Sequence, residues 1–458
     1  MGPVLIANRG EIAARIARSC RRLGWPSIAV FSEADAGALH VQQADRAEAI
    51  GPAHPRESYL CIPALIAAAE RSGARYVHPG YGFLSENAEF AEACARAGLT
   101  FIGPSPEAIR AMGGKAAARA IAEKAGVPCL PGDAGADQSE AALAAAAGRI
   151  GYPVMIKAIG GGGGRGMRRV RKPEEFSAAL AAARREAAIF GDERVMLEKL
   201  VEDARHIEVQ IIADSHGNVL HLHERDCTLQ RRHQKLVEEC PAPGVDPALR
   251  AELGRRACAL ARAVGYVGAG TVEFIAQQSL GADGIWFMEM NTRLQVEHPV
   301  TEMVTGLDLV EWQLRIAAGE ALPFRQSDIR LDGHAVEARL CAEDPARQFL
   351  PSPGRLAALD LPEGEGIRVD AGVRAGDAVT PYYDSMLAKV IAHAPTRELA
   401  LEKLARALDA TRAEGVRLNA AFLAAALRSA EMRGATMHTG FLEAQRTRLL
   451  DAVVKEPA

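Results

Sequence analysis

Polar and apolar side chains alternate through residues 287–299, and this stretch carries the residue types best suited to chemistry. If the segment is extended, five polar side chains share one face, because successive side chains of a strand point to opposite sides. They are Glu289, Asn291, Arg293, Gln295 and Glu297. Carboxylate and amide oxygens are ligands for a hard cation, and a fixed guanidinium suits a small anion. The pattern therefore predicts a site for a metal nucleotide beside a small anion, rather than a solvated strand face with mixed charges.

A neighbouring strand is expected to add a further ligand. Residues 271–276 and 285–291 form a predicted hairpin that sets Glu273 on the strand beside Glu289. Together with Asn291, these carboxylates offer three oxygen ligands for Mg²⁺ bound to nucleotide phosphates. A structural calcium site is the alternative, but the segment lacks a loop of closely spaced acids.

Five consecutive glycines, residues 160–164, follow a predicted strand over residues 152–158 that contains Lys157. The bare N–H groups of such a run, with Lys157 and Arg165, could wrap a polyphosphate. The run does not match the Walker pattern, which ends in Lys and Ser or Thr. A flexible linker is the alternative, whereas the strand before the run favours a moving lid. Residues 224–235 also gather cations and amides, which fits either this site or a basic solvated loop.

The composition is that of an ordinary soluble protein. The chain has 458 residues, of which 48% are hydrophobic and 24% charged, and this length is enough for about three domains. A net charge of −4 gives no general reason to bind nucleic acid or a membrane surface. The eight cysteines form no C-x-x-C pair, which indicates reduced thiols. No apolar run reaches the ~20 residues of a membrane span, and no signal peptide precedes the first strand. We expect a cytoplasmic protein, or a mature form without its presequence.

The first 110 or so residues alternate short apolar runs with amphipathic patterns, which is typical of a parallel sheet with crossover helices. Strands are predicted over residues 4–7, 28–31, 76–78 and 100–102. A helix over 11–23 places Ile12, Ile16 and Leu23 on one face and its arginines largely elsewhere. The first turn, Asn8-Arg9-Gly10, lacks the G-x-G-x-x-G spacing. The prediction is a Rossmann-like fold without its nucleotide.

Later segments mix both element types. Ser105 is the predicted cap of a helix that leads to a boundary near residue 113. An alanine-rich helix is predicted at 139–147, strands at 205–213 and 219–224, and a helix at 247–264. Residues 331–446 have the pattern of a mixed α/β domain, with a helix over 396–410 that carries Leu399, Leu401, Leu404 and Leu408. The predicted class is therefore α/β.

Eight strings resemble, in order, the biotin carboxylase family of the ATP-grasp fold. They are HPGYGFLSEN, MGGK, IKAIGGGGGRGM, ERDCTLQRRHQK, EECPAPG, GTVEF, MEMNTRLQVEHPVTEM and FLPSPG. Cys240 stands where alanine is usual in this family. The string TGLDLVEWQLRIAAGEALP further resembles the α subunits of acyl-CoA carboxylases. The resemblance implies a Rossmann-like N-terminal domain over 1–113, an ATP-grasp domain over 114–330 with a mobile glycine-rich lid at about 130–200, a mixed α/β C-terminal domain over 331–446, and a tail over 447–458.

The same resemblance assigns roles to single residues. Lys115, Lys157 and His206 would contact the phosphates or ribose of ATP, under a lid that contains Gly163 and Gly164. Glu198, Lys199 and Val201 would line the adenine pocket, which Gln230 and His233 complete. Glu273, Glu289 and Asn291 would bind Mg²⁺ or Mn²⁺. Lys235, Arg293, Gln295 and Val296 would hold bicarbonate, with Glu297 as the base that takes its proton, and Arg339 would face the ureido oxygen of biotin.

The implied reaction joins these roles. Glu297 would deprotonate bicarbonate in line with the γ-phosphate, and Arg293 beside it would keep the carboxylate ionised. Carboxyphosphate would then yield CO2 and phosphate, phosphate would take the N1 proton of biotin, and Arg339 would stabilise the ureido oxygen. Closure of a lid would exclude water from carboxyphosphate.

The expected partners follow from one missing motif. No methionine precedes a lysine, so the Met-Lys-Met acceptor of biotin carriers is absent from these residues. Biotin would therefore be carried on another domain or subunit. A biotin carboxyl carrier domain or protein, a carboxyltransferase β subunit, and further copies of the chain in a homo-oligomer or larger assembly are the expected partners. The alternatives are another ATP-grasp ligase that activates a carboxylate, and a nucleotide-binding regulatory subunit that has lost turnover.

Overall fold

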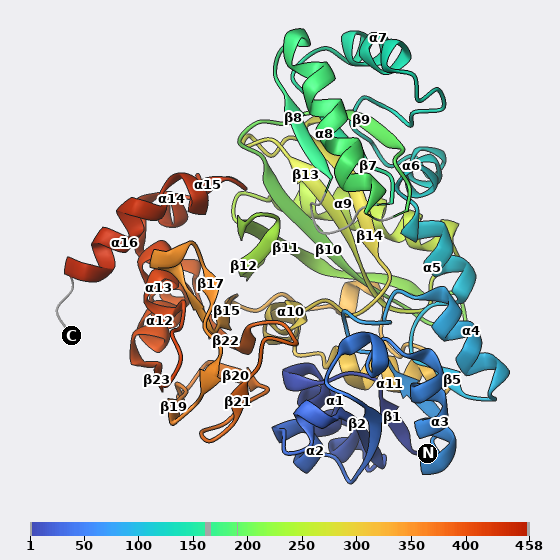
Figure 1. Ribbon diagram of the computed structural model, residues 1–458, viewed down its shortest axis with the longest axis vertical. Coiled ribbons are helices and arrows are strands. Elements are labelled where there is room, and N and C mark those ends of the chain that lie inside the picture. Colours follow the sequence, from blue (N-terminus) through green and yellow to red (C-terminus); the bar gives the residue numbers. More distant parts are fainter. Residues whose placement is uncertain (1, 161–165, 190, 456–458) are drawn as a thin grey trace.

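The computed structural model describes residues 2–160, 166–189 and 191–455, and its N-terminal region is built on a five-stranded parallel sheet (Figure 1). The strand order is β3-β2-β1-β4-β5. The strands are β1 (Val4–Ile6), β2 (Ser27–Ser32), β3 (Arg46–Gly51), β4 (Tyr76–His78) and β5 (Thr100–Phe101). Each of the four predicted strands is found, and the parallel pairing is confirmed. Strand β3 was not predicted, because it is an edge strand with exposed Arg46 and few apolar residues.

Helices surround this sheet and continue the chain toward the centre of the molecule. They are α1 (Gly10–Leu23), α2 (Leu39–Gln43), α3 (Ile62–Ser72), α4 (Ala88–Arg96), α5 (Pro106–Gly113) and α6 (Lys115–Lys124). The predicted cap of α5 is confirmed, since Ser105 Oγ accepts the N–H of Ala108 at 3.2 Å. In α1, Ile12 and Ile16 are buried as expected, but Arg15 is buried too. Its guanidinium is neutralised by Glu302 at 2.8 Å, a partner far away in the sequence.

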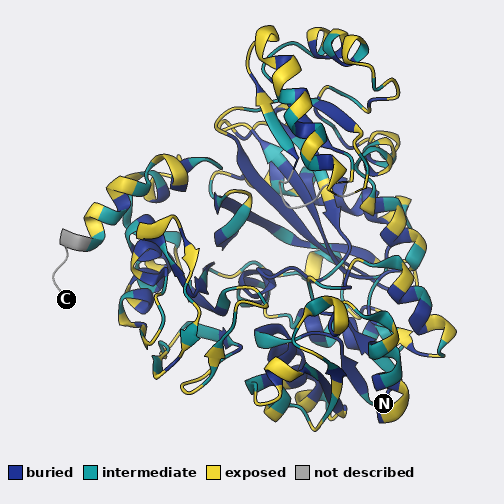
Figure 2. Cartoon of the chain, viewed as in Figure 1, coloured by how far each residue is buried: buried dark blue, intermediate teal, exposed yellow. Residues whose placement is uncertain are grey.

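One eight-stranded antiparallel sheet forms the middle of the molecule, and Figure 2 shows its long strands largely buried. Its order is β14-β13-β10-β11-β12-β15-β22-β20. The strands are β10 (Arg205–Ala213), β11 (Val219–Arg231), β12 (Gln234–Cys240), β13 (Gly268–Ala276), β14 (Ile285–Asn291), β15 (His334–Cys341), β20 (Ile367–Ala371) and β22 (Met386–Ala394). The predicted strand over 219–224 is longer than expected. The basic stretch after it is a hairpin of two largely buried strands, and only its turn at Arg232 and His233 is exposed.

The two faces of this sheet have different coverings. Helices α9 (Pro247–Ala263), α10 (His298–Thr305) and α11 (Leu309–Ala317) pack around it. Side chains of β10 alternate, so that Ile207 and Val209 enter the apolar core beneath α9. The polar residues between them point to the other face, where Arg225 of β11 donates to Thr301 of α10 at 3.0 Å. The apolar packing on one face therefore fixes which side chains line the other.

A smaller sheet projects at one end of the molecule, at the top in Figure 1. Its order is β6-β9-β7-β8. The elements are β6 (Gly132–Asp133), β7 (Val154–Ala158), β8 (Met167–Val170), β9 (Val195–Lys199), α7 (Glu140–Ile150) and α8 (Phe176–Ala188). It has an apolar core of its own that includes Leu143, Ile156 and Phe176. The predicted alanine-rich helix and the strand before the glycines are found, whereas most of the glycine run, including Gly163 and Gly164, lies outside the described residues.

The C-terminal region combines short strands and helices, as predicted. They are β16 (Glu343–Asp344), β17 (Leu350–Pro351), β18 (Gly354–Arg355), β19 (Ala358–Asp360), β21 (Ala378–Val379), β23 (Arg412–Glu414), α12 (Arg397–Ala410), α13 (Ala420–Arg428), α14 (Ala430–Arg433), α15 (Phe441–Ala444) and α16 (Arg446–Lys455). Its core is continuous with Leu229 and Leu236 of the central sheet. Strands from both sides of residue 330 thus share one sheet.

Two expectations from composition can be compared with the structure. All eight cysteines fall in the described ranges, and each carries a free thiol. Within the described part of the chain, no helix is both long and apolar enough to cross a membrane.

Helix α12 supplies a matched test of the core. Leu404 is fully buried, whereas Leu399 on the same helix is 56% exposed. Leu404→Ala should destabilise the protein by about 2–5 kcal/mol, because it leaves a cavity. Leu399→Ala should cost less than about 0.5 kcal/mol. Urea-unfolding midpoints of the two variants test this, and equal shifts would contradict the assigned burial.

Candidate active site

Three neighbouring strands set carboxylates side by side on the polar face of the central sheet. Glu208 of β10 is the register partner of Glu273 on β13, and Glu273 is the partner of Glu289 on β14. Residues that face each other across antiparallel strands point to the same side. Glu208 and Glu273 are buried, whereas Glu289 reaches solvent. The predicted hairpin therefore does bring Glu273 and Glu289 together.

The ammonium group of Lys235 on β12 neutralises this acidic row. Its Nζ lies 2.7 Å from Glu273 Oε1 and 2.6 Å from Glu297 Oε1, and it also pairs with Glu208. Burial lowers the pKa of Lys235, but the three carboxylates outweigh burial and raise this pKa well above its usual value. Lys235 is therefore a permanently charged centre that binds several strands together.

The segment after β14 does not continue as the strand that the alternation predicted. Strand β14 ends at Asn291, residues 292–297 are irregular, and α10 begins at His298. Glu297 has φ −82° and ψ 12°, and Pro299 occupies the first turn of the helix, where proline is favoured. The polar side chains converge nevertheless, because this loop folds across the sheet instead of extending beside it.

Arg293 holds the loop together through hydrogen bonds on three sides. Its Nη1 donates to Gln295 Oε1 and its Nη2 to Asn291 Oδ1, both at 2.9 Å. Its Nε donates to Glu86 Oε2 at 2.8 Å. We expected Arg293 to keep Glu297 ionised. Burial lowers the pKa of Arg293, but the neighbouring acids, Glu86 first and Glu297 after it, raise it above its usual value. The direct ion-pair partner of Arg293 is Glu86, so its effect on Glu297 stays a prediction. Glu86 was not among the predicted site residues, although it lies within the string HPGYGFLSEN.

Glu297 is fully buried between two other cations. Lys235 contacts one of its oxygens, and Arg339 Nη2 of β15 lies 3.0 Å from the other. Burial raises the pKa of Glu297, yet Lys235 and Arg339 lower it well below its usual range. Arg339 also pairs with Glu238 of β12 at 2.6 Å. The groups predicted to hold bicarbonate and biotin are thus in direct contact with the predicted base.

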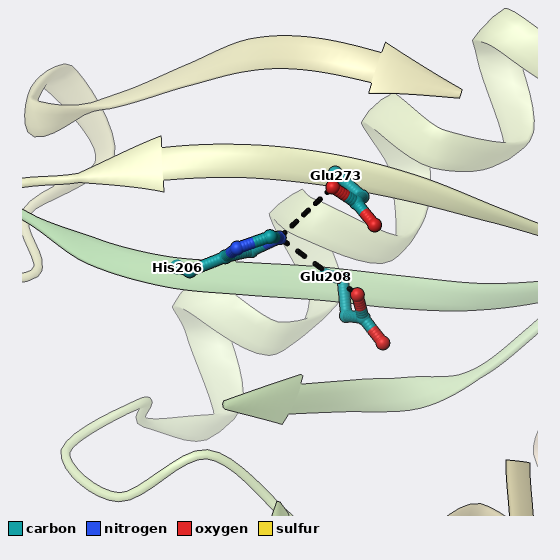
Figure 3. Close-up of side chains that lie close together, drawn as sticks. All are labelled: His206, Glu208 and Glu273. Atoms are coloured by element: carbon teal, nitrogen blue, oxygen red, sulfur yellow. Dashed lines mark ion pairs between the residues drawn. The ribbon is translucent and has the colours of Figure 1, made fainter. Parts of the chain in front are cut away.

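His206 extends the polar row along β10, as Figure 3 shows. Its Nε2 lies 3.0 Å from Glu273 Oε2 and 3.8 Å from Glu208 Oε2. Burial lowers the pKa of His206, but Glu273 and Glu208 together raise it above the usual value. Gln230 lies 3.4 Å from His206 Nδ1, and His233 occupies the turn of the β11–β12 hairpin at φ 67°. The predicted nucleotide-pocket residues from these strands are therefore neighbours.

The other predicted nucleotide residues lie on or near the small sheet. Lys157 of β7 is paired with Glu198 of β9, and Lys115 Nζ donates to the carbonyl of Ala158 at 3.1 Å. Burial lowers the pKa of Lys115, which Glu289 partly opposes. The Lys199 ammonium donates to the carbonyls of Gly151 and Tyr152 at 2.8 and 3.0 Å, and so ties β9 to the segment before β7. Val201 follows β9 and is half-buried.

The donor set at the edge of the row suits a hard divalent cation. Glu273, Glu289 and Asn291 offer only oxygen ligands, and they come from the paired strands β13 and β14. Asn291 Nδ2 donates to Glu273 Oε1 at 2.8 Å, which turns the amide oxygen outward to Arg293. Two other groups of possible ligands, His206–Glu208–Glu273 and Glu208–Cys227–Glu297, surround Lys235 instead. A cation is already present there, so those groups need no metal.

Three family models match the chain in order. They are described as Biotin carboxylase, N-terminal domain, over residues 1–109; Carbamoyl-phosphate synthase L chain, ATP binding domain, over 114–325; and Biotin carboxylase C-terminal domain, over 337–444. A biotin carboxylase of Halalkalibacterium halodurans is 54% identical over 419 residues, which is 91% of each chain. The α subunit of rat mitochondrial methylcrotonoyl-CoA carboxylase is 52% identical over 98% of this chain, but this chain spans only 62% of that subunit.

Solved structures agree with these matches. The biotin carboxylase of Campylobacter jejuni superposes with a TM-score of 0.93 at 45% identity. The match covers 96% of this chain and 98% of the Campylobacter chain. The biotin carboxylase domain dimer of Hydrogenobacter thermophilus 2-oxoglutarate carboxylase, in complex with MgADP and bicarbonate, gives a TM-score of 0.93 at 43% identity, over 100% of this chain and 99% of its own. The predicted fold class is thereby confirmed, and the chain belongs to the biotin carboxylase family, as its motifs predict.

Proposed function

We propose that this chain is an ATP-dependent ligase that carboxylates the N1 atom of biotin with bicarbonate. The observation that carries the proposal is the direct contact of Glu297 with both Lys235 and Arg339. The base that deprotonates bicarbonate and the cation that faces the ureido oxygen of biotin must act on neighbouring atoms. Here the proposed cation, Arg339, is in direct contact with the proposed base, Glu297. The intact site also weighs against a regulatory subunit that has lost turnover.

Nucleotide binding is proposed at the junction of the small and central sheets. Lys115, Lys157 and His206 would contact the phosphates or ribose of ATP, and Glu198, Lys199, Val201, Gln230 and His233 would surround the base and complete the pocket. Lys157 is paired with Glu198, so a phosphate would compete with this carboxylate for the ammonium group, which has three donors. Glu273, Glu289 and Asn291 would hold Mg²⁺ or Mn²⁺. When bound, the metal neutralises charge on the phosphate oxygens.

Bicarbonate binding is proposed at the loop over residues 292–297. Arg293, Gln295, Val296 and Lys235 would hold the anion, and Glu297 would remove its proton as the oxygen attacks the γ-phosphate. A carboxylate whose pKa lies well below the usual range is a weak base. An anion that draws Lys235 toward itself would weaken one of the contacts that hold this pKa down. The base would therefore gain strength when its substrate arrives.

The second half of the reaction would use Arg339. Attack of bicarbonate on ATP gives ADP and carboxyphosphate, and carboxyphosphate breaks down to CO2 and phosphate. Phosphate accepts the N1 proton of biotin, and N1 then attacks CO2. Negative charge develops on the ureido oxygen, and a guanidinium that already lies in the site can stabilise it without reorganisation.

The acceptor and the assembly belong to the same proposal. Because no methionine precedes a lysine in these residues, we infer that biotin is presented by a carrier domain or a separate carrier protein. The similarity to a methylcrotonoyl-CoA carboxylase α subunit supports a carboxyltransferase β subunit as a further partner in an acyl-CoA carboxylase assembly, together with copies of this chain. Eight free thiols support a reducing compartment such as the cytoplasm.

Glu297→Gln tests the base. Bicarbonate-dependent ADP formation should fall roughly 10²–10⁴-fold, the range expected when a general base is lost. ATP binding, measured by calorimetry, should change little, because Glu297 is not among the proposed nucleotide contacts. Glu224→Gln is the matched control, since Glu224 is also a buried carboxylate but pairs with Arg250 of α9. Loss of ATP binding in parallel with turnover would mean that Glu297 is structural.

Arg339→Ala separates the two half-reactions. ADP formation that depends on bicarbonate should largely survive, whereas transfer of labelled bicarbonate to free biotin should fall by about 100-fold or more, as for loss of an oxyanion donor. Arg250→Ala, which also strips the arginine partner from a buried glutamate, controls for general destabilisation. Carboxybiotin formation at the normal rate would refute the role of Arg339.

A further inference from the structure

Lys389 of β22 is a fully buried lysine directly behind the loop that we propose for bicarbonate. Its Nζ donates to the backbone carbonyl of Val296 at 2.8 Å. Arg339 is its register partner on β15, so the two side chains lie on the same face of the sheet. None of the roles proposed above uses Lys389.

The buried ammonium is fixed by acids from two further elements. Glu11 Oε1 of α1 lies 3.2 Å from Lys389 Nζ, and Asp370 Oδ2 of β20 lies 3.9 Å away. Burial raises the pKa of Asp370, but Arg368 and Lys389 outweigh burial and lower it well below its usual range, so Asp370 stays ionised. A buried lysine without partners would be costly. These acids therefore allow a cation to remain at this position, and they restrict where it can point.

The contact with Val296 determines the direction of a peptide group in an irregular loop. A charged donor makes a stronger hydrogen bond than a neutral one. Because the peptide unit is planar and trans, a carbonyl of Val296 that points to Lys389 turns the N–H of Glu297 to the opposite side. The same bond limits how the chain can enter α10, where Glu297 is the residue before the first turn. The orientation of the Glu297 backbone thus depends on a side chain about 90 residues later, on β22.

We propose that Lys389 is a positioning residue for bicarbonate, which acts by holding the Val296 carbonyl so that the loop and the Glu297 carboxylate meet the anion in one arrangement. Lys389 itself touches no reacting atom. The inference rests on the proposed function, because it takes bicarbonate as the ligand of this loop. A purely structural role, in which Lys389 only ties β22 to α1, makes different predictions for the variants below.

Lys389→Met removes the donor and retains most of the side-chain length. The KM for bicarbonate, measured through ADP formation with Mg-ATP and free biotin, should rise roughly 10- to 100-fold, the loss expected when a reacting group is misplaced by about 1 Å. The KM for Mg-ATP should stay within about twofold, as this contact does not involve the nucleotide pocket. This split between two substrates is not expected from general destabilisation.

Two further variants distinguish the Val296 contact from the rest of the cluster. Glu11→Gln removes one acid but leaves Lys389 bonded to Val296, so the bicarbonate KM should remain near that of the wild type. Arg397→Met removes a partly buried cation, which donates to the carbonyls of Met432 and Arg433 at 2.8 and 3.0 Å and pairs with Glu239. It should lower the melting temperature without changing the bicarbonate KM.

Lys389→Gln keeps an N–H donor on a shorter side chain, and it provides the measurement if the methionine variant does not fold. Its bicarbonate KM should lie between those of the wild type and the methionine variant, and above that of Arg397→Met. An unchanged bicarbonate KM in the Lys389 variants, or an equal rise in Glu11→Gln, would overturn the positioning role while leaving the proposed function intact. A wild-type chain whose ADP formation ignores bicarbonate would overturn both.

Discussion

The contact of one buried ammonium group, that of Lys235, with three carboxylates is the constraint on which the rest of the site depends. Glu208, Glu273 and Glu297 come from β10, β13 and the loop before α10, and Lys235 is the cation that all three share. Each acid also has a second partner, which is Arg225 for Glu208, His206 for Glu273 and Arg339 for Glu297. Removal of Lys235 would therefore leave three buried acids with less compensation. The cluster is neutralised only when these strands pair in a single register. A slip of one residue would exchange the polar residues of β10, including Glu208, with Ile207 and Val209 of the core. The packing of the apolar core and the pairing of charges around Lys235 therefore require the same strand register.

The cations of the site have two roles in this account. Before substrates arrive they pair with protein carboxylates: Lys235 and Arg339 with Glu297, Arg293 with Glu86, and Lys157 with Glu198. These pairs keep positive charge in place inside the protein. Anionic substrates would then compete for charges that are already oriented, so little reorganisation is needed when the reaction begins. Before the substrates bind, the contacts of Lys235 and Arg339 with Glu297 keep its pKa low and so limit its strength as a base.

Much of the site could be predicted because it depends on local patterns. Alternation along residues 205–213 and the hairpin that carries Glu273 and Glu289 required only the period of a strand. The prediction that the strand continues through residues 292–297 was wrong, since Pro299 and the start of α10 bend the chain there. Contacts with distant partners could not be predicted either. Glu86 lies about 200 residues before Arg293, and no periodicity connects them.

The same limit explains the differences in the fold. The burial of Arg15 depends on Glu302, and the continuity of the central sheet depends on β12 pairing with β15. Leu399 belongs to the predicted apolar series of its helix but is exposed, because propensity and spacing define a helix without saying what covers it. The glycine run that motivated the predicted lid falls mostly outside the described residues, so its role rests on the motif and on the family.

The central claim is that this cluster of charges couples ATP cleavage to bicarbonate and biotin. The most direct measurement is ADP release by the purified chain from Mg-ATP, with and without bicarbonate, and with and without free biotin. The account predicts ADP release that requires bicarbonate and increases when biotin is added. Release of ADP at a rate indifferent to both would contradict it.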